Sequence, residues 1–302
     1  MSEKPYRNLF NDARRLLMGR TRSIILLVLV AWSLLHFVFV EPSLRRGHVI
    51  GGLPTPVDSS TFVWTLRNRG YLVGYSQQRR NPLWVAYRLR GTNDPNHEER
   101  PSRFDSDWRM VHSVSHDDYT GSGYDRGHMA PNYAIATRFG RKAQLETFLM
   151  TNICPQTPSL NRGPWRMLEE RVAKKYANNF GEVWVITGPI FNRQIARLKS
   201  GVEVPDAFYK IIVDQTENAG IRTIAFIMPQ LVRGTESPDQ FVTTIDHVES
   251  LTGLDFLAEL DDPIEVAVEA AGPDLQWRTP GGTAVSSMWS PPPFQLTGYR
   301  GQ

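Results

Sequence analysis

The chain has 302 residues, is 41% hydrophobic and 11% aromatic, and carries a formal net charge of +3. These values exclude an intrinsically disordered chain and predict one large folded domain or two small ones. The positive charge alone does not indicate nucleic-acid binding, because residues 1–22 contribute +4 and the remaining residues −1. Residues 126–175 carry +6 and residues 203–275 carry −12, which predicts one face that attracts an anion and another that repels it.

The first predicted element is a membrane anchor. Residues 23–40 are eighteen residues without a formal charge, a length that just spans a bilayer as a helix. No small-residue cleavage site follows, which favours an uncleaved signal anchor over a cleaved signal peptide or a buried helix. Six basic residues within 1–22 predict a cytoplasmic N-terminus. The rest of the chain is then extracytoplasmic, on the periplasmic side of an inner membrane or in a mitochondrial intermembrane space.

A linker and then alternating strands and helices follow the anchor. Residues 41–60 are rich in Pro, Gly and Ser and predict a linker. Runs of β-branched and aromatic residues predict strands at 62–66, 70–75, 83–90, 148–154, 182–188, 208–214 and 222–228. Helices are expected at 132–148, 163–180 and 237–252. The irregular mixture predicts an α+β domain over 61–262 with a mainly antiparallel sheet, and a disordered tail over 263–302.

The stretch YDRGHMAPN, residues 124–132, contains the first chemical signal. His128 follows Asp125 and Arg126, and Gly127 lets the backbone turn without steric cost. A lone histidine is more often structural than catalytic, so His128 needs partners elsewhere in the chain. The single cysteine, Cys154, is interpreted as a small buried hydrophobe.

Candidate partners for His128 lie in the stretch TNICPQTPSLNRGPWRMLEER, residues 151–171. It offers the amides Asn152, Gln156 and Asn161, the carboxylates Glu169 and Glu170, and the bases Arg162, Arg166 and Arg171. Amide and carboxylate oxygens suit a hard cation such as Mg²⁺. A hard metal, a histidine base and several arginines suit attack on a phosphodiester. From composition alone, Asn161 as a simple helix cap with solvated arginines remains an equal alternative.

These two stretches closely resemble the DNA/RNA non-specific endonucleases, a family with the ββα-metal fold that includes endonuclease G. DYTGSGYDRGHMAPN contains the family's D-R-G-H signature, and Asn152, Asn161 and Glu169 match the spacing of its second block. The resemblance covers about residues 60–260, from RGYLVGYSQQRRNPLWVAYRL through VWVITGPIF and VPDAFYKIIV to GLDFL. It implies a ββα-metal (His-Me finger) nuclease domain with a mainly antiparallel sheet and flanking helices.

The resemblance also implies a role for each matching residue. His128 matches the general base and Asn161 the direct protein ligand of the metal. Glu169 matches the residue that holds the metal's water shell, Arg126 a phosphate-contacting arginine, and Asn152 a supporting active-site amide. Asp125 is expected to orient the loop. Arg166 and Arg171 stay unassigned, because the match loosens after Glu169.

The implied activity is sugar-non-specific cleavage of DNA or RNA that leaves 5′-phosphates, with Mg²⁺ as cofactor and Mn²⁺ as a substitute. His128, neutral and near its ordinary pKa, would take a proton from the attacking water. Contacts are expected mainly to backbone phosphates. A homodimer is left open.

Other interpretations compete with this one. A non-catalytic, membrane-anchored protein of the same fold could bind or capture nucleic acid, although it would not need His128. A scaffold that recruits a partner through its tail is a third hypothesis. The pair His112 and His116 has the spacing of a zinc site on a helix, but the surrounding polar stretch shows no helical periodicity.

Overall fold

The computed structural model describes residues 27–29, 31, 47–94, 96–191, 196–216, 220–272 and 277. The chain divides into two compact units, Met1–Gly47 and His48–Gln302. In the first unit, residues 27–29 and 31 are helical. Most of the predicted anchor at 23–40 lies outside the described residues, and none of the helices that are described is long and apolar enough to span a bilayer.

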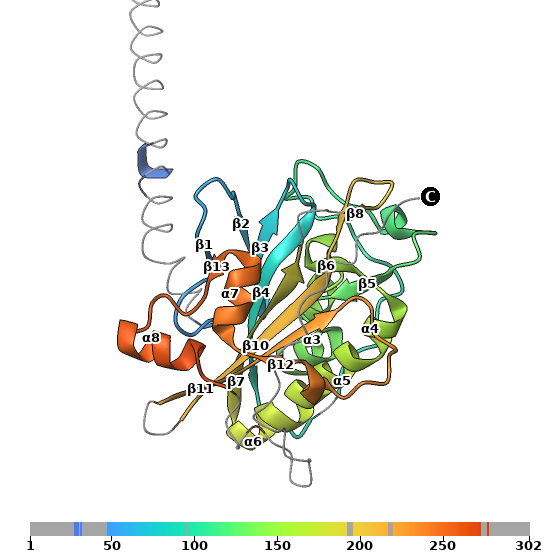
Figure 1. Cartoon of the computed structure of the whole chain (residues 1–302). Helices are drawn as coiled ribbons and strands as arrows, with labels where there is room; N and C mark the ends of the chain where they lie inside the picture. Colours follow the sequence, from blue (N-terminus) through green and yellow to red (C-terminus); the bar gives the residue numbers. More distant parts are fainter. Residues whose placement is uncertain are drawn as a thin grey trace, which may run out of the picture. The chain divides into compact units, whose positions relative to one another are not determined.

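A seven-stranded antiparallel sheet forms the centre of the second unit (Figure 1). Its strand order is β12-β11-β10-β7-β4-β3-β2, and each neighbouring pair is antiparallel. The strands are β2 (Trp64–Asn68), β3 (Tyr71–Ser76), β4 (Asn81–Arg90), β7 (Glu182–Ile190), β10 (Ala207–Gln215), β11 (Ile221–Pro229) and β12 (Val242–Thr243). The predicted antiparallel α+β architecture is therefore confirmed.

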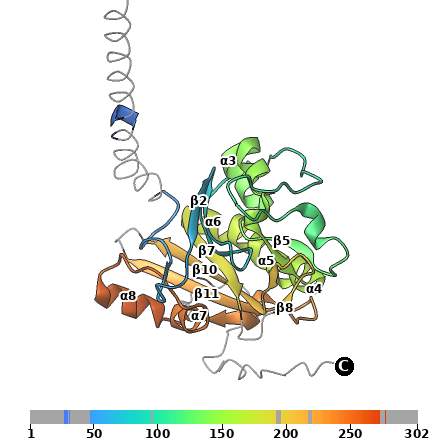
Figure 2. The same cartoon turned by 90° about the horizontal axis from the view of Figure 1, so that it is seen from above.

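Helices cover both faces of this sheet, as the two views in Figures 1 and 2 show. One face packs against α3 (Asn132–Glu146) and α5 (Pro164–Arg171), and Tyr87, Val85, Trp165 and Leu168 belong to one buried cluster. The other face packs against α7 (Ile245–Thr252) and α8 (Asp262–Glu269) through a second cluster. Side chains alternate along each strand, which explains how a strand can be buried on both sides.

Shorter elements surround the sheet. They are the strand pairs β1 (Thr55–Pro56) with β13 (Leu254–Asp255), β5 (Asp125–His128) with β6 (Ile153–Gln156), and β8 (Ala196–Arg197) with β9 (Glu203–Val204). The helical ones are α4 (Pro158–Arg162), α6 (Ala177–Phe180) and the single turns His116–Tyr119, Met150–Asn152, Val172–Tyr176 and Pro238–Phe241. The β5–β6 pair is separate from the main sheet and positions the site described below.

Two predicted elements differ from the structure. The strand expected at 148–154 begins only at Ile153, because residues Met150–Asn152 form a 3₁₀ turn in which Asn152 bonds to the main chain. The helix expected at 237–252 divides into a short turn, strand β12 and α7. Thr244 begins α7, since its hydroxyl accepts a hydrogen bond from the His247 amide at 3.3 Å.

The compact unit extends beyond the predicted domain at both ends. Residues from His48 onwards belong to it, and β1 pairs with β13, so the end of the predicted linker at 41–60 is folded. At the other end, α8 lies within the predicted tail and buries Val268 against the sheet. Ile264, Ala267 and Val268 recur at helical spacing, a signal that the sequence interpretation missed.

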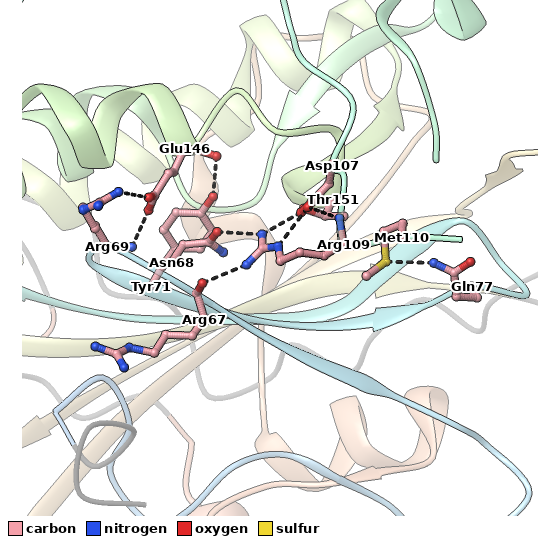
Figure 3. A network of polar contacts seen from close by, with 10 residues as sticks. All are labelled: Arg67, Asn68, Arg69, Tyr71, Gln77, Asp107, Arg109, Met110, Glu146 and Thr151. Atoms are coloured by element: carbon pink, nitrogen blue, oxygen red, sulfur yellow. Dashed lines mark hydrogen bonds and ion pairs between the residues drawn. The ribbon is translucent and has the colours of Figure 1, made fainter. Parts of the chain in front are cut away.

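The long connection between β4 and β5 is fixed by a buried polar network (Figure 3). Arg109 donates to the carbonyl of Arg67 at 2.8 Å and to Asn68 Oδ1 at 2.9 Å, while its Nη2 lies 2.6 Å from Asp107 Oδ2. The same carboxylate accepts from the Thr151 hydroxyl at 2.7 Å. The network therefore ties this connection both to the edge strand β2 and to the turn that precedes β6.

Candidate active site

The β5–β6 pair presents His128 at its end. Gly127 lies opposite Cys154 and His128 opposite Ile153. A Cβ atom on Gly127 would lie 2.0 Å from Oε1 and 2.6 Å from Cγ of the buried Gln156 side chain, so glycine leaves the room that this side chain occupies. The glycine of the motif is thus required by packing, and it fixes the position of the histidine that follows.

His128 is almost fully buried between two aromatic rings. Its ring centroid lies 5.3 Å from that of Phe104 and 5.0 Å from that of Phe148. Burial, with a contribution from the positive charge of Arg100, lowers the pKa of His128 to about 3. The expectation of a neutral imidazole agrees with this value, whereas the expected ordinary pKa does not, because the aromatic surroundings disfavour the imidazolium.

Asn161 and Glu169 come from two successive helices. Asn161 lies in α4, where its Nδ2 donates to Asp125 Oδ2 at 2.9 Å. Asp125 also accepts from Arg162 at 2.8 Å and 2.7 Å, and this arginine and the Asn161 amide lower the pKa of Asp125 against the effect of burial. Because its nitrogen is engaged by Asp125, the Asn161 side chain has its oxygen available as a ligand.

Glu169 lies in the last turn of α5, where the charge of a buried lysine acts on it. Burial raises the pKa of Glu169 to about 7, and the positive charge of Lys210 opposes this rise. Lys210 in β10 is fully buried, donates to Thr187 Oγ1 at 3.2 Å and lies 4.3 Å from the ring centroid of Trp165. Trp165 precedes Glu169 by one helical turn of α5, and the Lys210 charge favours the ionised Glu169 carboxylate.

Arg126 and Asn152 act differently at this site. Arg126 lines the cavity, and its guanidinium donates to the His116 carbonyl at 3.0 Å and 2.6 Å. Asn152 is buried beneath it: its side chain accepts from the Ala130 amide at 2.8 Å and donates to the carbonyls of Ala130 and Thr147. Asn152 is not among the lining residues and holds the backbone that follows His128.

A single cavity of about 550 Å³ brings together His128, Arg126, Asn161 and Glu169. Its lining also contains the bases Arg100, Arg162, Arg166 and Lys174 and the acids Asp125 and Glu170. Bases outnumber acids, so the cavity attracts an anion.

Oxygen atoms on the cavity residues fit a hydrated cation. His128 Nε2, Glu169 Oε1 and Asn132 Oδ1 are buried and have no hydrogen-bond partner in the described part of the chain. Buried polar atoms of this kind are normally satisfied by water or an ion. Glu169 Oε1, Asn132 Oδ1 and the Asn161 oxygen are the oxygen ligands on this wall that suit a hydrated hard cation, since Mg²⁺ retains several waters and takes few protein ligands, and His128 Nε2 is left to accept a proton.

The sequence interpretation missed Arg100 and Lys210. Arg100 follows the strand predicted at 83–90 in a segment for which no element or site was predicted, yet it lines the cavity and its guanidinium carbon lies 5.4 Å from the Phe148 centroid. Lys210 is a single charged residue within the mainly apolar run 207–213, which was a usable signal. The pair His112 and His116 is not part of any metal-ligand cluster found among the described residues.

Comparisons with known proteins show which proteins this chain resembles. The family model described as DNA/RNA non-specific endonuclease matches residues 52–263. A nuclease from a Nostoc species is 31% identical over 243 residues, 76% of this chain and 86% of the relative. Human mitochondrial endonuclease G is 29% identical over 205 residues, 63% of this chain and 68% of the relative. The solved structure of an EndoG/EndoGI complex matches with a TM-score of 0.58 and 26% identity, over 66% of this chain and 88% of that chain.

Proposed function

Because the chain belongs to the DNA/RNA non-specific endonuclease family, we propose that it is a metal-dependent endonuclease that leaves 5′-phosphate ends on DNA or RNA. The observation that carries this proposal is that His128, Asn161 and Glu169 line one cavity with an excess of basic residues. The chemistry requires a base for water, ligands for a hard cation and positive charge for phosphate, and all three converge there.

His128 is the proposed general base. Its low pKa keeps the imidazole neutral and able to accept a proton, although so low a pKa makes it a weak base. A bound phosphodiester brings negative charge beside the ring and raises the pKa of His128 towards neutrality. The substrate would therefore make His128 a stronger base. Arg100 would pair with the phosphate, so that its positive charge would oppose protonation of the imidazole less.

Asn161 and Glu169 are the proposed holders of a divalent cation, Mg²⁺ or Mn²⁺. The cation, when bound, supplies charge neutralisation at the phosphate and at the departing 3′ oxygen. Asp125 keeps the Asn161 side chain oriented through its hydrogen bond to Nδ2. Arg126 is held by the His116 carbonyl at the cavity wall, where it would bind a phosphate oxygen.

We also propose that residues 23–40 anchor the nuclease with its catalytic unit outside the cytoplasm. Eighteen uncharged residues after six basic ones support this topology. A phosphatase reporter that is active only outside the cytoplasm, fused to the C-terminus, should be active in a bacterial host. Activity of a cytoplasm-only reporter at the same position would overturn the topology.

A plasmid-nicking assay tests the activity and separates the roles of the residues. Full-length protein should nick supercoiled plasmid with Mg²⁺, lose this activity in EDTA and leave nicks that ligase seals without prior phosphorylation. His128→Ala should reduce the rate by about 10²–10⁴-fold without changing the Mg²⁺ requirement. Asn161→Ala should raise the Mg²⁺ concentration needed for half-maximal rate, and excess Mg²⁺ should restore part of the rate.

The same assay can reject the proposal. Plasmid binding without cleavage at any metal concentration would indicate a non-catalytic nucleic-acid-binding protein. A His128→Ala variant that is folded by circular dichroism and cleaves at the wild-type rate would remove His128 from the mechanism.

A further inference from the structure

A cluster of carboxylates lies between α7 and α8. Oxygen atoms of Asp246, Glu249 and Glu269 all lie within 4.8 Å of one another. Asp246 and Glu249 are three residues apart on α7, so they share one face of that helix. Glu269 ends α8 and approaches them from the second helix.

Glu269 is the unusual member of this cluster. Its side chain is only 7% exposed, and its Oε1 is buried without a hydrogen-bond partner. Burial, together with the negative charges of Glu249, Glu265, Asp246 and Asp255, raises the pKa of Glu269 to about 8. A buried carboxylate that faces other carboxylates requires a positive charge or a proton to be stable.

The protein itself does not supply that positive charge in its described part. Among the described residues from 47 to 272, none of these five acids forms an ion pair with a basic side chain. The charged groups that shift the pKa of Glu269 are all acidic. One Glu249 oxygen accepts a hydrogen bond from the Phe256 amide at 2.8 Å, which orients the carboxylate without neutralising its charge. The Thr223 hydroxyl donates to the Val268 carbonyl at 3.2 Å and fixes the end of α8 against the sheet.

The cluster is separate from the catalytic cavity. Ile245, Val248 and Val268 anchor α7 and α8 to one face of the sheet, whereas Trp165 and Leu168 of α5 pack on the other. None of the five acids lines the cavity. A ligand at the cluster would therefore act on the stability of the fold rather than on the reaction.

We propose that Asp246, Glu249 and Glu269 bind a divalent cation, with Ca²⁺ as the best match. Three carboxylates from two helices offer only oxygen ligands, and Ca²⁺ accepts six to eight oxygens in flexible geometry. Asp246 is exposed, which leaves room for water to complete the coordination shell. The bound ion joins α7 to α8 and neutralises part of the acidic 203–275 region.

Calcium titration of the metal-free full chain tests the proposal. Calorimetry should detect a Ca²⁺ site, and saturating Ca²⁺, at a hundredfold above its Kd, should raise the Tm by about 5–10 °C. Glu269→Gln should lose this shift and at least tenfold in affinity, while retaining Mg²⁺-dependent plasmid cleavage. Glu259→Gln removes an exposed acid of the same region outside the cluster and is the matched control, with wild-type affinity expected.

The Asn161→Ala variant distinguishes the two metal sites. Because Asn161 belongs to the cavity, this variant should retain the Ca²⁺-dependent rise in Tm. A Ca²⁺ response that is lost in Asn161→Ala and kept in Glu269→Gln would assign the binding to the cavity and overturn the proposal. Absence of any Ca²⁺ response in the wild type would overturn it as well, leaving a proton to neutralise Glu269.

Discussion

At the residue scale, the burial of His128, the proposed general base, makes the stability of the fold sensitive to acid. The folded state keeps the imidazole neutral down to a pKa of about 3, whereas the unfolded chain binds a proton near the ordinary value of 6.5. The unfolded state therefore binds more protons between these values, and stability falls as the pH decreases below 6.5. The same burial that keeps the base neutral makes the folded protein sensitive to acid.

Replacing His128 should remove that sensitivity. In EDTA, the wild type should lose about 2 kcal/mol of unfolding free energy between pH 7.5 and pH 5 through this one group, since each pH unit below 6.5 costs about 1.4 kcal/mol. Urea titrations of His128→Asn should show a pH dependence smaller by this amount. His112→Asn is the control, because that side chain is exposed. Equal pH dependence in wild type and His128→Asn would contradict the buried, neutral imidazole.

Lys210 should control the charge of Glu169, which is proposed to hold the cation. Without the Lys210 charge, the pKa of Glu169 rises beyond about 7, so less carboxylate is ionised at neutral pH. Lys210→Met should therefore require more Mg²⁺ than the wild type for half-maximal cleavage at pH 7. Above pH 8 the wild-type lysine itself loses its proton, because burial lowers its pKa to about 8. The two enzymes should then converge at pH 9, and a constant defect at both pH values would indicate a purely structural role.

The sequence motif predicted three residues that line one cavity, but not the charged residues around them. His128, Asn161 and Glu169 followed from a motif whose spacing is local and readable. Lys210 was missed because it is 41 residues from Glu169 in the sequence, and the two come close only when β10 and α5 pack together. No local pattern encodes such a contact, although a lysine within an apolar strand marks a buried charge that needs a partner.

At the element scale, the strands that were predicted correctly are those with long apolar runs. β3, β4, β7, β10 and β11 all contain such runs and form the centre of the sheet. The failures lie where side chains bond to the backbone, as at Asn152, or where a short helix depends on tertiary packing, as in α8. Propensity is a weak guide there, because tertiary contacts decide the local structure.

The β4–β5 connection depends on a buried ion pair, and a matched pair of variants tests this. Asp107 is 1% exposed, so Arg109→Met leaves a buried carboxylate without its partner and should cost about 3 kcal/mol, or about 6–12 °C in Tm. Arg103→Met breaks the Arg103–Asp117 pair of the same connection, whose side chains are 64% and 68% exposed, and should cost less than about 1 kcal/mol. Thermal melts that place the two variants within 2 °C of each other would argue against this network as the anchor of the connection.

At the scale of the whole molecule, charge is divided between the two faces of the sheet. Five basic residues line the cavity on one side, while the acids of α7 and α8 lie on the other. A polyanion should therefore approach only the cavity side, steered by long-range attraction and repulsion. With this division, a chain of small net charge is expected to bind nucleic acid in one orientation.

The salt dependence of binding should report this division residue by residue. Each phosphate neutralised contributes about −0.9 to the slope of log K against log salt on duplex DNA. Lys174 lines the cavity, so Lys174→Gln in a His128→Ala background should reduce the magnitude of the slope by about one. Lys142 on α3 is equally a helical lysine at the surface but lies outside the cavity lining, and Lys142→Gln should leave the slope unchanged.

Fluorescence anisotropy with a short duplex in EDTA measures both slopes without cleavage. Equal reductions in both variants would mean that substrate contacts spread evenly over the surface. This result would contradict the prediction that the cavity binds the phosphates.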